Sequence, residues 1–450
     1  MNSGSKFLHL SVLAALSGTA LLAVQSAGAS GFSIAEQSAS GLGNAYAGAA
    51  AVAEDASTLF FNSAGLTQLT RPSLVMTGAA IQIKSEFKNN GSVAATGQAL
   101  GTNGGDAGGT ILVPALYVAV PLSDTVTGGL AVNAPFGLKT EYNDDFIGRF
   151  QGIVSDVKTT NINTALAFKL NNVVSLGVGA NYQTIDAKLT KNINYTAAIA
   201  SNTGGALVLP GLQGGVEIKG NDSAWGYDVG LLFNFNDRTH VGLSYRSAIK
   251  YNVAGNAAFS PPTTTNATGQ AIINAASAST LANGPVTLAI KLPASARLAA
   301  TQKLGNSVEL LGEVSWTQWS SVPELRINRT NGVTLSNTPE QWDDTMRYAL
   351  GANFQLNDAV KLRVGAAKDE APVPDSTRTP RLPDNDRTWL TAGAQVKVTN
   401  NINMDVAYAN IKAKDAALNQ NDGSTAANGL LKGTQKTSIN ILSLQATVSF

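Results

Sequence analysis

Apolar and polar residues alternate along several short stretches of the chain. In the last stretch, Leu442 and Leu444 fall on one side, and Ser443 and Gln445 fall on the other. The same alternation runs through residues 225–231, 241–245 and 402–408. Because successive side chains of a strand point to opposite faces, each stretch predicts a strand with one apolar face. Spanning strands of outer-membrane barrels show this pattern over about 10 residues.

Short polar turns alternate with longer connections along the chain. The six short turns lie at residues 122–124, 170–172, 235–237, 304–306, 356–358 and 398–401. The seven longer connections lie near residues 88–109, 139–157, 190–223, 254–284, 330–343, 369–385 and 415–436. Outer-membrane barrels place short turns in the periplasm and longer loops outside. The pattern therefore predicts an all-β fold, a 14-stranded antiparallel transmembrane barrel over residues 71–450.

The first 29 residues have the layout of a secretory signal peptide. Lys6 is followed by an apolar run over residues 10–24, and Ala27-Gly28-Ala29 supplies the small residues of a cleavage site. We expect cleavage after Ala29; an anchor helix is the alternative. Nothing later in the chain approaches the roughly 20 apolar residues of a spanning helix. The expected strands must then close into a barrel, so that every backbone group in the membrane finds a partner.

Composition narrows the class of protein further. The chain contains no cysteine, which excludes a disulfide-stapled secreted scaffold. Removal of Lys6 with the signal peptide leaves 30 basic and 30 acidic residues, so we expect no nucleic-acid partner. The chain ends on Phe450, and a terminal aromatic residue is a recognition mark for the outer-membrane assembly machinery. We expect a monomer in contact with outer-membrane lipid and lipopolysaccharide; a secreted β-sandwich or solenoid is the soluble alternative.

Residues 30–70 do not alternate and are rich in Ala, Gly and Ser. Two parts of this segment, residues 41–53 and 56–69, have helical character. The segment is too short to form a domain with its own core, and a disordered tail would be more charged and less apolar. We therefore expect an N-terminal helical hatch that plugs the lumen of the barrel, with a loose periplasmic tail as the alternative.

Motifs of a known family occur in the expected hatch and continue along the chain. Residues 40–48 read Ser-Gly-Leu-Gly-Asn-Ala-Tyr-Ala-Gly, and residues 55–64 read Asp-Ala-Ser-Thr-Leu-Phe-Phe-Asn-Ser-Ala. Pro-Phe-Gly-Leu follows at 135–138 and Pro-Asp-Asn-Asp-Arg-Thr-Trp-Leu at 383–390. In this ordered series the chain resembles the FadL/TodX family of outer-membrane long-chain fatty acid transport proteins. The resemblance covers essentially the whole mature chain and implies uptake of hydrophobic molecules through a plugged barrel.

The resemblance also implies moving parts in the hatch. Phe32 matches a phenylalanine near the mature N-terminus that reaches into the family's binding pocket, where it would act as a displaceable stopper. Asn62, Ser63 and Ala64 stand where the family usually has Asn-Pro-Ala. These residues are expected to take part in gating, with a local geometry altered by the missing proline.

A side exit is implied in the third strand. The family has an inward kink there that opens a gap in the wall, and Pro135, Phe136 and Gly137 occupy this position. Proline is disfavoured inside a sheet because it cannot donate a ladder hydrogen bond. We expect cargo to leave sideways into the membrane at this point; the alternative is that Pro135 simply ends a strand.

Cargo binding calls for an apolar pocket, with one or two cations if the cargo carries a carboxylate. By resemblance, Lys191 is the basic residue that contacts the carboxylate, whereas the second basic position falls at Thr338. The resemblance favours long-chain fatty acids, and Thr338 leaves neutral compounds such as aromatic hydrocarbons as the alternative cargo. A general water-filled porin is a third reading, against which the expected hatch argues.

Two long connections contain apolar clusters. Leu207 and Leu209 lie in the connection over residues 192–222, and Ile272 lies in the connection over residues 255–285. An external apolar groove would capture greasy molecules before they meet lipopolysaccharide. We interpret these residues as that groove, with ordinary loop variation as the alternative.

Catalytic chemistry finds little support in the sequence. His240, the one histidine after the signal peptide, lies beside a turn expected in the periplasm, away from where an outer-membrane lipase would need it. Asp144 and Asp145 lie in an expected external loop, where a solvated surface or a divalent-ion contact with lipopolysaccharide suits them better than catalysis. We expect no enzyme activity, no cofactor and no metal site.

Overall fold

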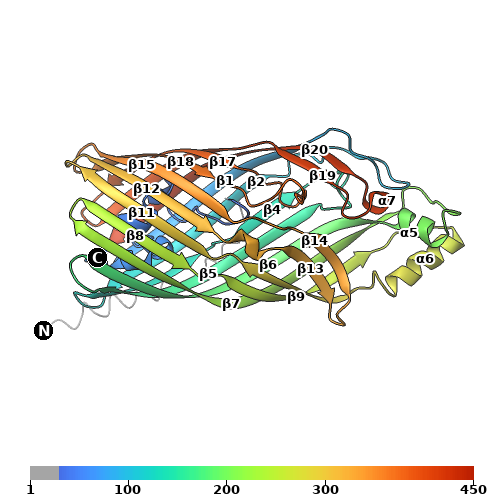
Figure 1. Ribbon diagram of the computed structural model, residues 1–450, viewed down its shortest axis with the longest axis horizontal. Helices are drawn as coiled ribbons and strands as arrows, with labels where there is room; N and C mark the ends of the chain where they lie inside the picture. Colours follow the sequence, from blue (N-terminus) through green and yellow to red (C-terminus); the bar gives the residue numbers. More distant parts are fainter. Residues whose placement is uncertain (1–29) are drawn as a thin grey trace.

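The computed structural model describes residues 30–450, which form a closed antiparallel β-barrel with a hatch inside (Figure 1). The expected signal peptide, residues 1–29, lies outside the described residues. The first and last strands close the barrel: β1 (Ser73–Asn89) pairs with β20 (Leu431–Ser449) from Ser73–Ser449 to Asn89–Gly433. The predicted fold class, a 14-stranded transmembrane barrel with a helical hatch in its lumen, is confirmed.

Eight of the spanning strands are continuous and six are interrupted. Besides β1 and β20, the continuous strands are β2 (Gly109–Pro121), β5 (Val154–Lys169), β6 (Val174–Asn194), β7 (Gln213–Asn236), β16 (Val360–Asp369) and β17 (Arg387–Lys397). The interrupted strands are β3 (Val126–Asn133) with β4 (Gly137–Glu141), β8 (Thr239–Arg246) with β9 (Ile249–Ser260), β10 (Gly284–Leu292) with β11 (Ser295–Leu304), β12 (Val308–Thr317) with β13 (Glu324–Arg329), β14 (Thr334–Pro339) with β15 (Thr345–Gln355), and β18 (Ile402–Ala413) with β19 (Ala416–Gln420).

The two ends of the barrel differ. The short turns and the C-terminus lie at one end, and α5 (Tyr195–Asn202), α6 (Ala267–Ser277) and α7 (Thr425–Asn428) lie at the other (Figure 1). One expected long connection, residues 330–343, is wrong: residues 330–333 form a tight turn between β13 and β14. Asn331-Gly332 suits such a turn because Gly332 adopts a left-handed φ of 85°. In the described part of the chain, no helix is long and apolar enough to cross a membrane.

Alternation along the strands sorts side chains between lipid and lumen. In β20, Leu442 and Leu444 are more than half exposed on the outer face, whereas Ser443 and Gln445 are buried inside. The burial pattern of the strand repeats every second residue, as a barrel with an apolar outside and a polar lumen requires.

The hatch fills the lumen with short pieces of helix. These are α2 (Ala39–Leu42), α3 (Ala49–Val52), α4 (Thr58–Phe61) and the 3-10 helix η1 (Ser63–Gln68). The helical stretches expected over residues 41–53 and 56–69 are broken into these short pieces. Ala45 and Tyr46 adopt left-handed backbone angles within the first stretch, and Asn62 is extended within the second, with φ −159° and ψ 103°. Small residues let the hatch approach the wall closely: a Cβ on Gly242 of β8 would lie 1.8 Å from the carbonyl oxygen of Ala50.

Candidate functional site

The third spanning strand is broken at Pro135. β3 ends at Asn133 and β4 begins at Gly137, and both pieces pair with β5. The ladder between β3 and β2 stops at the pair Leu116–Val132. Beyond this pair, residues 109–115 of β2 have β1 as their only strand partner among the described residues. The wall therefore has no ladder between this part of β2 and β4.

Proline stands on both sides of this break. Pro114 lies in the part of β2 that pairs with β1 but has no strand partner on its other side. Pro135 lies between β3 and β4. Neither residue has a backbone N–H, so neither can donate a hydrogen bond across the gap. The two prolines therefore disfavour a ladder of hydrogen bonds between the two edges of the break.

The start of the hatch takes the place of β2 beside the break. Ser33 forms an antiparallel bridge with Phe136. The amide of Ile34 donates to the carbonyl oxygen of Pro135 at 2.8 Å, and the amide of Gly137 donates to that of Phe32 at 2.7 Å. The break is therefore closed by a segment that belongs to the hatch rather than to the barrel wall.

Phe32 packs at the centre of an aromatic cluster. Its ring lies 5.0 Å from Trp319 and 5.9 Å from both Phe136 and Trp342, measured between ring centres. All four side chains are buried. Trp319 comes from the short 3-10 helix η2 (Trp319–Ser321), which interrupts the ninth spanning strand, so a strand break also shapes this cluster.

Below the aromatic cluster lies an inner cavity that brings several expected gating residues together. Asn62, Ser63, Pro135 and Phe136 all line it. The side-chain amide of Asn62 donates to the carbonyl oxygens of Ala50 and Leu231, at 2.7 and 3.0 Å. Hatch and wall therefore meet at this cavity through directional hydrogen bonds.

Ala64 lies just outside the inner cavity. Its amide donates to the Asn62 side-chain oxygen at 3.1 Å. A Cβ added to Gly177 of β6 would lie 2.2 Å from that amide nitrogen. Hatch and β6 therefore approach each other closely at Ala64, beside the Asn62 side chain.

An outer cavity opens on the other side of the aromatic cluster. Its apolar lining includes Leu189, Val216, Ile218, Phe259, Ile327 and Leu335. Lys191 and Thr338, the two positions considered for carboxylate binding, both line it, and so does Arg381 from residues 370–386. The structure thus brings the expected binding positions together and adds a cation that sequence reasoning missed.

Lys191 is not free in this cavity. Its ammonium lies 2.9 Å from the carboxylate of Asp422, and both side chains are about one-fifth to one-quarter exposed. Arg381 instead donates to the carbonyl oxygens of Val154 and Thr190, at 3.1 and 3.2 Å. The two cations of the outer cavity therefore differ in whether a carboxylate already neutralises them.

The loop residues expected to form a capture groove pack in one apolar cluster between α5 and α6. Leu207, Leu209 and Ile272 are partly buried around a core of Tyr195, Ile199 and Ile273. Ile193 and Leu281 belong to this cluster and also line the outer cavity. Leu325 in turn lines the outer cavity and packs against the aromatic cluster of Phe32. Apolar contacts therefore run from the loop helices to the break.

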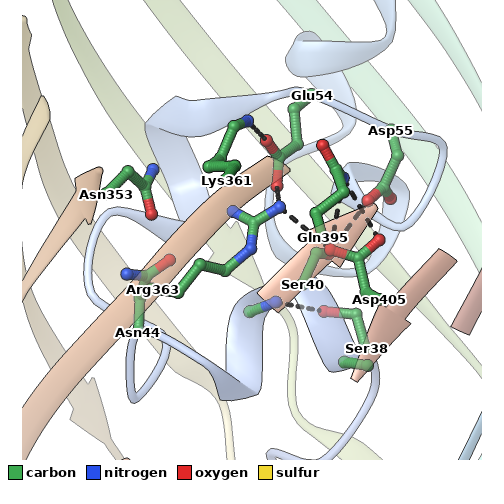
Figure 2. Close-up of polar contacts among 12 residues, drawn as sticks. Ser38, Ser40, Asn44, Glu54, Asp55, Asn353, Lys361, Arg363, Gln395 and Asp405 are labelled. Atoms are coloured by element: carbon green, nitrogen blue, oxygen red, sulfur yellow. Dashed lines mark hydrogen bonds and ion pairs between the residues drawn. The ribbon is translucent and has the colours of Figure 1, made fainter. Parts of the chain in front are cut away.

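A second contact between hatch and wall lies near the short-turn end of the barrel, where β16 begins. Glu54 of the hatch lies 2.8 Å from the Lys361 ammonium and 2.6 Å from the Arg363 guanidinium (Figure 2). Arg363 also lies 3.0 Å from Asp405, and both of their side chains are 1% exposed. We call Glu54, Lys361, Arg363 and Asp405 the hatch latch. Arg363 and Lys361 outweigh the effect of burial and lower the pKa of Glu54 to about 2, so the latch is charged at neutral pH.

The hatch latch separates two cavities. Glu54 and Arg363 line a small cavity within the hatch. Lys361 lines a wide vestibule at the short-turn end, together with Arg238 and Glu309. The ion pairs of the latch therefore lie between the interior of the hatch and the vestibule at the short-turn end of the barrel.

The remaining candidates lie away from these cavities. His240 lies in β8 next to its short turn, and Asp144 and Asp145 are exposed in the connection between β4 and β5. Asp145 accepts a hydrogen bond from the hydroxyl of Thr102 at 2.9 Å, which ties two loops together. Within residues 30–450, no group of three His, Cys, Asp or Glu side chains could hold a metal ion.

A plugged barrel with an interrupted wall and an apolar passage defines the class of outer-membrane transport proteins. Residues 20–450 match the model of the family described as outer membrane protein transport protein (OMPP1/FadL/TodX), and the chain belongs to this family. It is a protein of the outer membrane that serves transport and is not an enzyme.

Individual relatives agree with the family. The chain is 30% identical to the 47 kDa outer membrane protein of Pasteurella multocida, over 92% of this chain and 94% of the relative. It is 29% identical to the long-chain fatty acid transport protein of Escherichia coli, over 89% and 92%.

Solved structures share the fold. A FadL homologue from Pseudomonas aeruginosa has a TM-score of 0.86 at 23% identity and covers 93% of this chain and 100% of its own. The toluene transporter TodX of Pseudomonas putida has a TM-score of 0.63 at 13% identity, with 88% and 94% covered.

Phe32 offers a direct test of the aromatic cluster. With oleate as a hydrophobic probe, we predict that Phe32→Ala speeds ligand exchange by about tenfold, because removing a buried ring typically costs about 3–5 kcal/mol of packing. The loss would loosen a cluster that Phe136 links to the inner cavity and Leu325 links to the outer cavity. The release rate of oleate from protein in lipid nanodiscs measures this effect. Phe146→Ala, which removes a buried ring among the external loops, should leave the rate unchanged; equal rates for all three proteins would exclude a stopper.

Proposed function

We propose that this protein takes up long-chain fatty acids across the outer membrane. In this proposal, cargo is captured at the cluster of Leu207, Leu209 and Ile272, enters the outer cavity, displaces Phe32 and leaves through the break at Pro135. The observation that carries the proposal is the unbroken series of apolar contacts between these places, which share Leu281 and other side chains.

The height of the break supports sideways exit into the membrane. β3 has 8 residues between its short turn and the break, and a tilted strand needs about 9–11 residues to span the hydrocarbon. The break would then open toward the outer leaflet, where a fatty acid is soluble. For this to happen, the hatch segment bonded to Pro135 and Gly137 must rearrange.

Two features favour fatty acids as cargo. A relative that is 29% identical over most of its length is named a long-chain fatty acid transport protein. The outer cavity also contains two cations, Lys191 and Arg381, which an uncharged hydrocarbon would not need. Two features favour neutral aromatic compounds instead: Thr338 supplies no charge at the second position, and a cluster of aromatic rings lies on the proposed route.

Contacts with other molecules of the envelope belong to the same proposal. The side chain of Phe450 is 58% exposed and its amide donates to the carbonyl oxygen of Pro72 at 2.9 Å. This leaves the terminal ring accessible to the outer-membrane assembly machinery. We further propose that the protein works as a monomer surrounded by lipid and lipopolysaccharide.

Uptake by cells tests the cargo. A strain lacking the gene and the same strain with the gene restored are given labelled oleate, labelled toluene or a small labelled sugar. We expect the restored gene to raise oleate uptake alone. A rise in toluene uptake without oleate uptake would favour the neutral-cargo alternative, and a rise in sugar uptake would indicate a general porin.

A further inference from the structure

Arg381 is a cation in an apolar place. It lines the outer cavity, and its guanidinium donates to three uncharged oxygens, those of Val154, Ser155 and Thr190. Within residues 30–450, no carboxylate lies at ion-pair distance from it. A charge that is partly withdrawn from water and has no ion-pair partner is costly, so its presence needs an explanation.

Neither nearby carboxylate forms an ion pair with Arg381. Asp422 is bound to Lys191 at 2.9 Å. Glu340 is 3% exposed, lies between β14 and β15 and makes no ion pair with Arg381 in the described part of the chain. Burial lowers the pKa of Arg381, but only to about 10, and the guanidinium keeps its charge. The cavity therefore holds one cation without an ion-pair partner.

We propose that Arg381 is the carboxylate anchor of the outer cavity and sets its preference for acids over neutral molecules. This inference rests on the proposed uptake of fatty acids and assigns the head-group contact to a residue outside the two positions expected from the family. The planar guanidinium has five N–H donors and suits a two-point contact with a carboxylate. Lys191, neutralised by Asp422, contributes little to the affinity for the head group.

The location of Arg381 explains why it can take this role. It belongs to residues 370–386, which fold back into the mouth of the barrel, where its chain packs beside Gly152 and the end of β6. Thr338, on β14, lines the same cavity from another strand. A cation supplied by the loop can therefore compensate for the uncharged Thr338.

Binding of oleate and of its uncharged methyl ester by the full mature protein in lipid nanodiscs tests the inference. Both are measured by displacement of a fluorescent fatty acid. We expect the wild type to bind oleate about tenfold or more tightly than methyl oleate, the range expected for hydrogen bonds to a charged group. Arg381→Gln should remove this preference without weakening the methyl ester, whereas Arg381→Lys should retain part of it.

Matched variants separate the anchor from other roles. Arg326→Gln changes an exposed arginine on the adjacent strand β13 and should have no effect. Replacing Lys191 by Gln together with Asp422 by Asn removes the neighbouring ion pair and should preserve the preference for oleate. Loss of the preference in this double variant, with none in Arg381→Gln, would assign the anchor to Lys191 and overturn the inference.

Three further outcomes are decisive. Equal weakening of both ligands by Arg381→Gln would indicate a structural role for the arginine and contradict the anchor. Equal binding of oleate and methyl oleate by the wild type would also contradict it, while leaving uptake of hydrophobic molecules intact. Failure of the wild type to bind either ligand would instead overturn the proposed function itself.

Discussion

Replacing Pro135 and Gly137 together by valine is expected to slow oleate uptake strongly while leaving oleate binding intact. Valine at position 135 restores a backbone donor, and branched residues favour strand geometry. The third spanning strand could then pair with residues 109–115 of β2 and close the wall. Since each ladder hydrogen bond adds about 1 kcal/mol, a few restored bonds should slow uptake by about tenfold or more.

Uptake and binding are measured separately, with labelled oleate in cells and with oleate in nanodiscs. Pro121→Val is the matched control, because Pro121 lies at the other end of β2, where the ladder with β3 is intact. Its uptake should equal that of the wild type. Normal uptake by the double valine variant would remove the break from the route.

Breaking the hatch latch should have the second large effect. Arg363→Leu leaves the buried Asp405 without its ion-pair partner and takes one of two cations from Glu54, and removing one member of a buried ion pair costs about 3–5 kcal/mol. The hatch should loosen beside the vestibule lined by Lys361. We predict a lower unfolding temperature and a clear rise in ion conductance across planar bilayers.

Two controls bear on the latch. Arg326→Leu disrupts only an exposed ion pair with Glu324 and should change neither quantity. Adding Asp405→Asn to the Arg363 variant removes the buried charge left without a partner and should restore much of the stability. A conductance that stays at the wild-type level in Arg363→Leu would show that the latch does not seal the lumen.

The barrel could be predicted from the sequence because alternation and turns are local sequence patterns. In β20, Leu442 and Ser443 reveal their faces within two residues, and signals of this kind predict 14 strands without any tertiary information. The turn at Asn331-Gly332 was missed because its flanks are polar and seemed part of a longer loop. The sequence indicates broken helical stretches in the hatch but not where they break, because left-handed angles at non-glycine residues such as Ala45 and Tyr46 have no local signal.

The candidate site could be predicted only in part, because it depends on contacts between residues far apart in the sequence. Phe32, Lys191 and Pro135 were identified through resemblance, but their neighbours depend on how the barrel closes. Arg381 donates a hydrogen bond to Thr190, which lies 191 residues away in the sequence, and no local sequence pattern predicts such a contact. The aromatic partners of Phe32 likewise come from strand interruptions that are visible only once the ladders are known.

In the proposed route, the hatch segment must leave the break before cargo can pass. Ser33 and Phe136 are bridge partners, and opposed residues of antiparallel strands are close enough for a disulfide. The chain has no cysteine of its own, so replacing both residues by cysteine introduces a single reversible lock. A cysteine pair at Thr77 and Ala115, opposed within the intact β1–β2 ladder, serves as the control.

The deciding measurement is the rate of oleate uptake by cells carrying the Ser33→Cys and Phe136→Cys protein, before and after reduction. We predict that the oxidised protein gives no more uptake than cells lacking the gene, that reduction restores it, and that the Thr77–Ala115 pair is indifferent to both treatments. Equal uptake by the oxidised and reduced forms would show that the hatch segment does not have to leave the break.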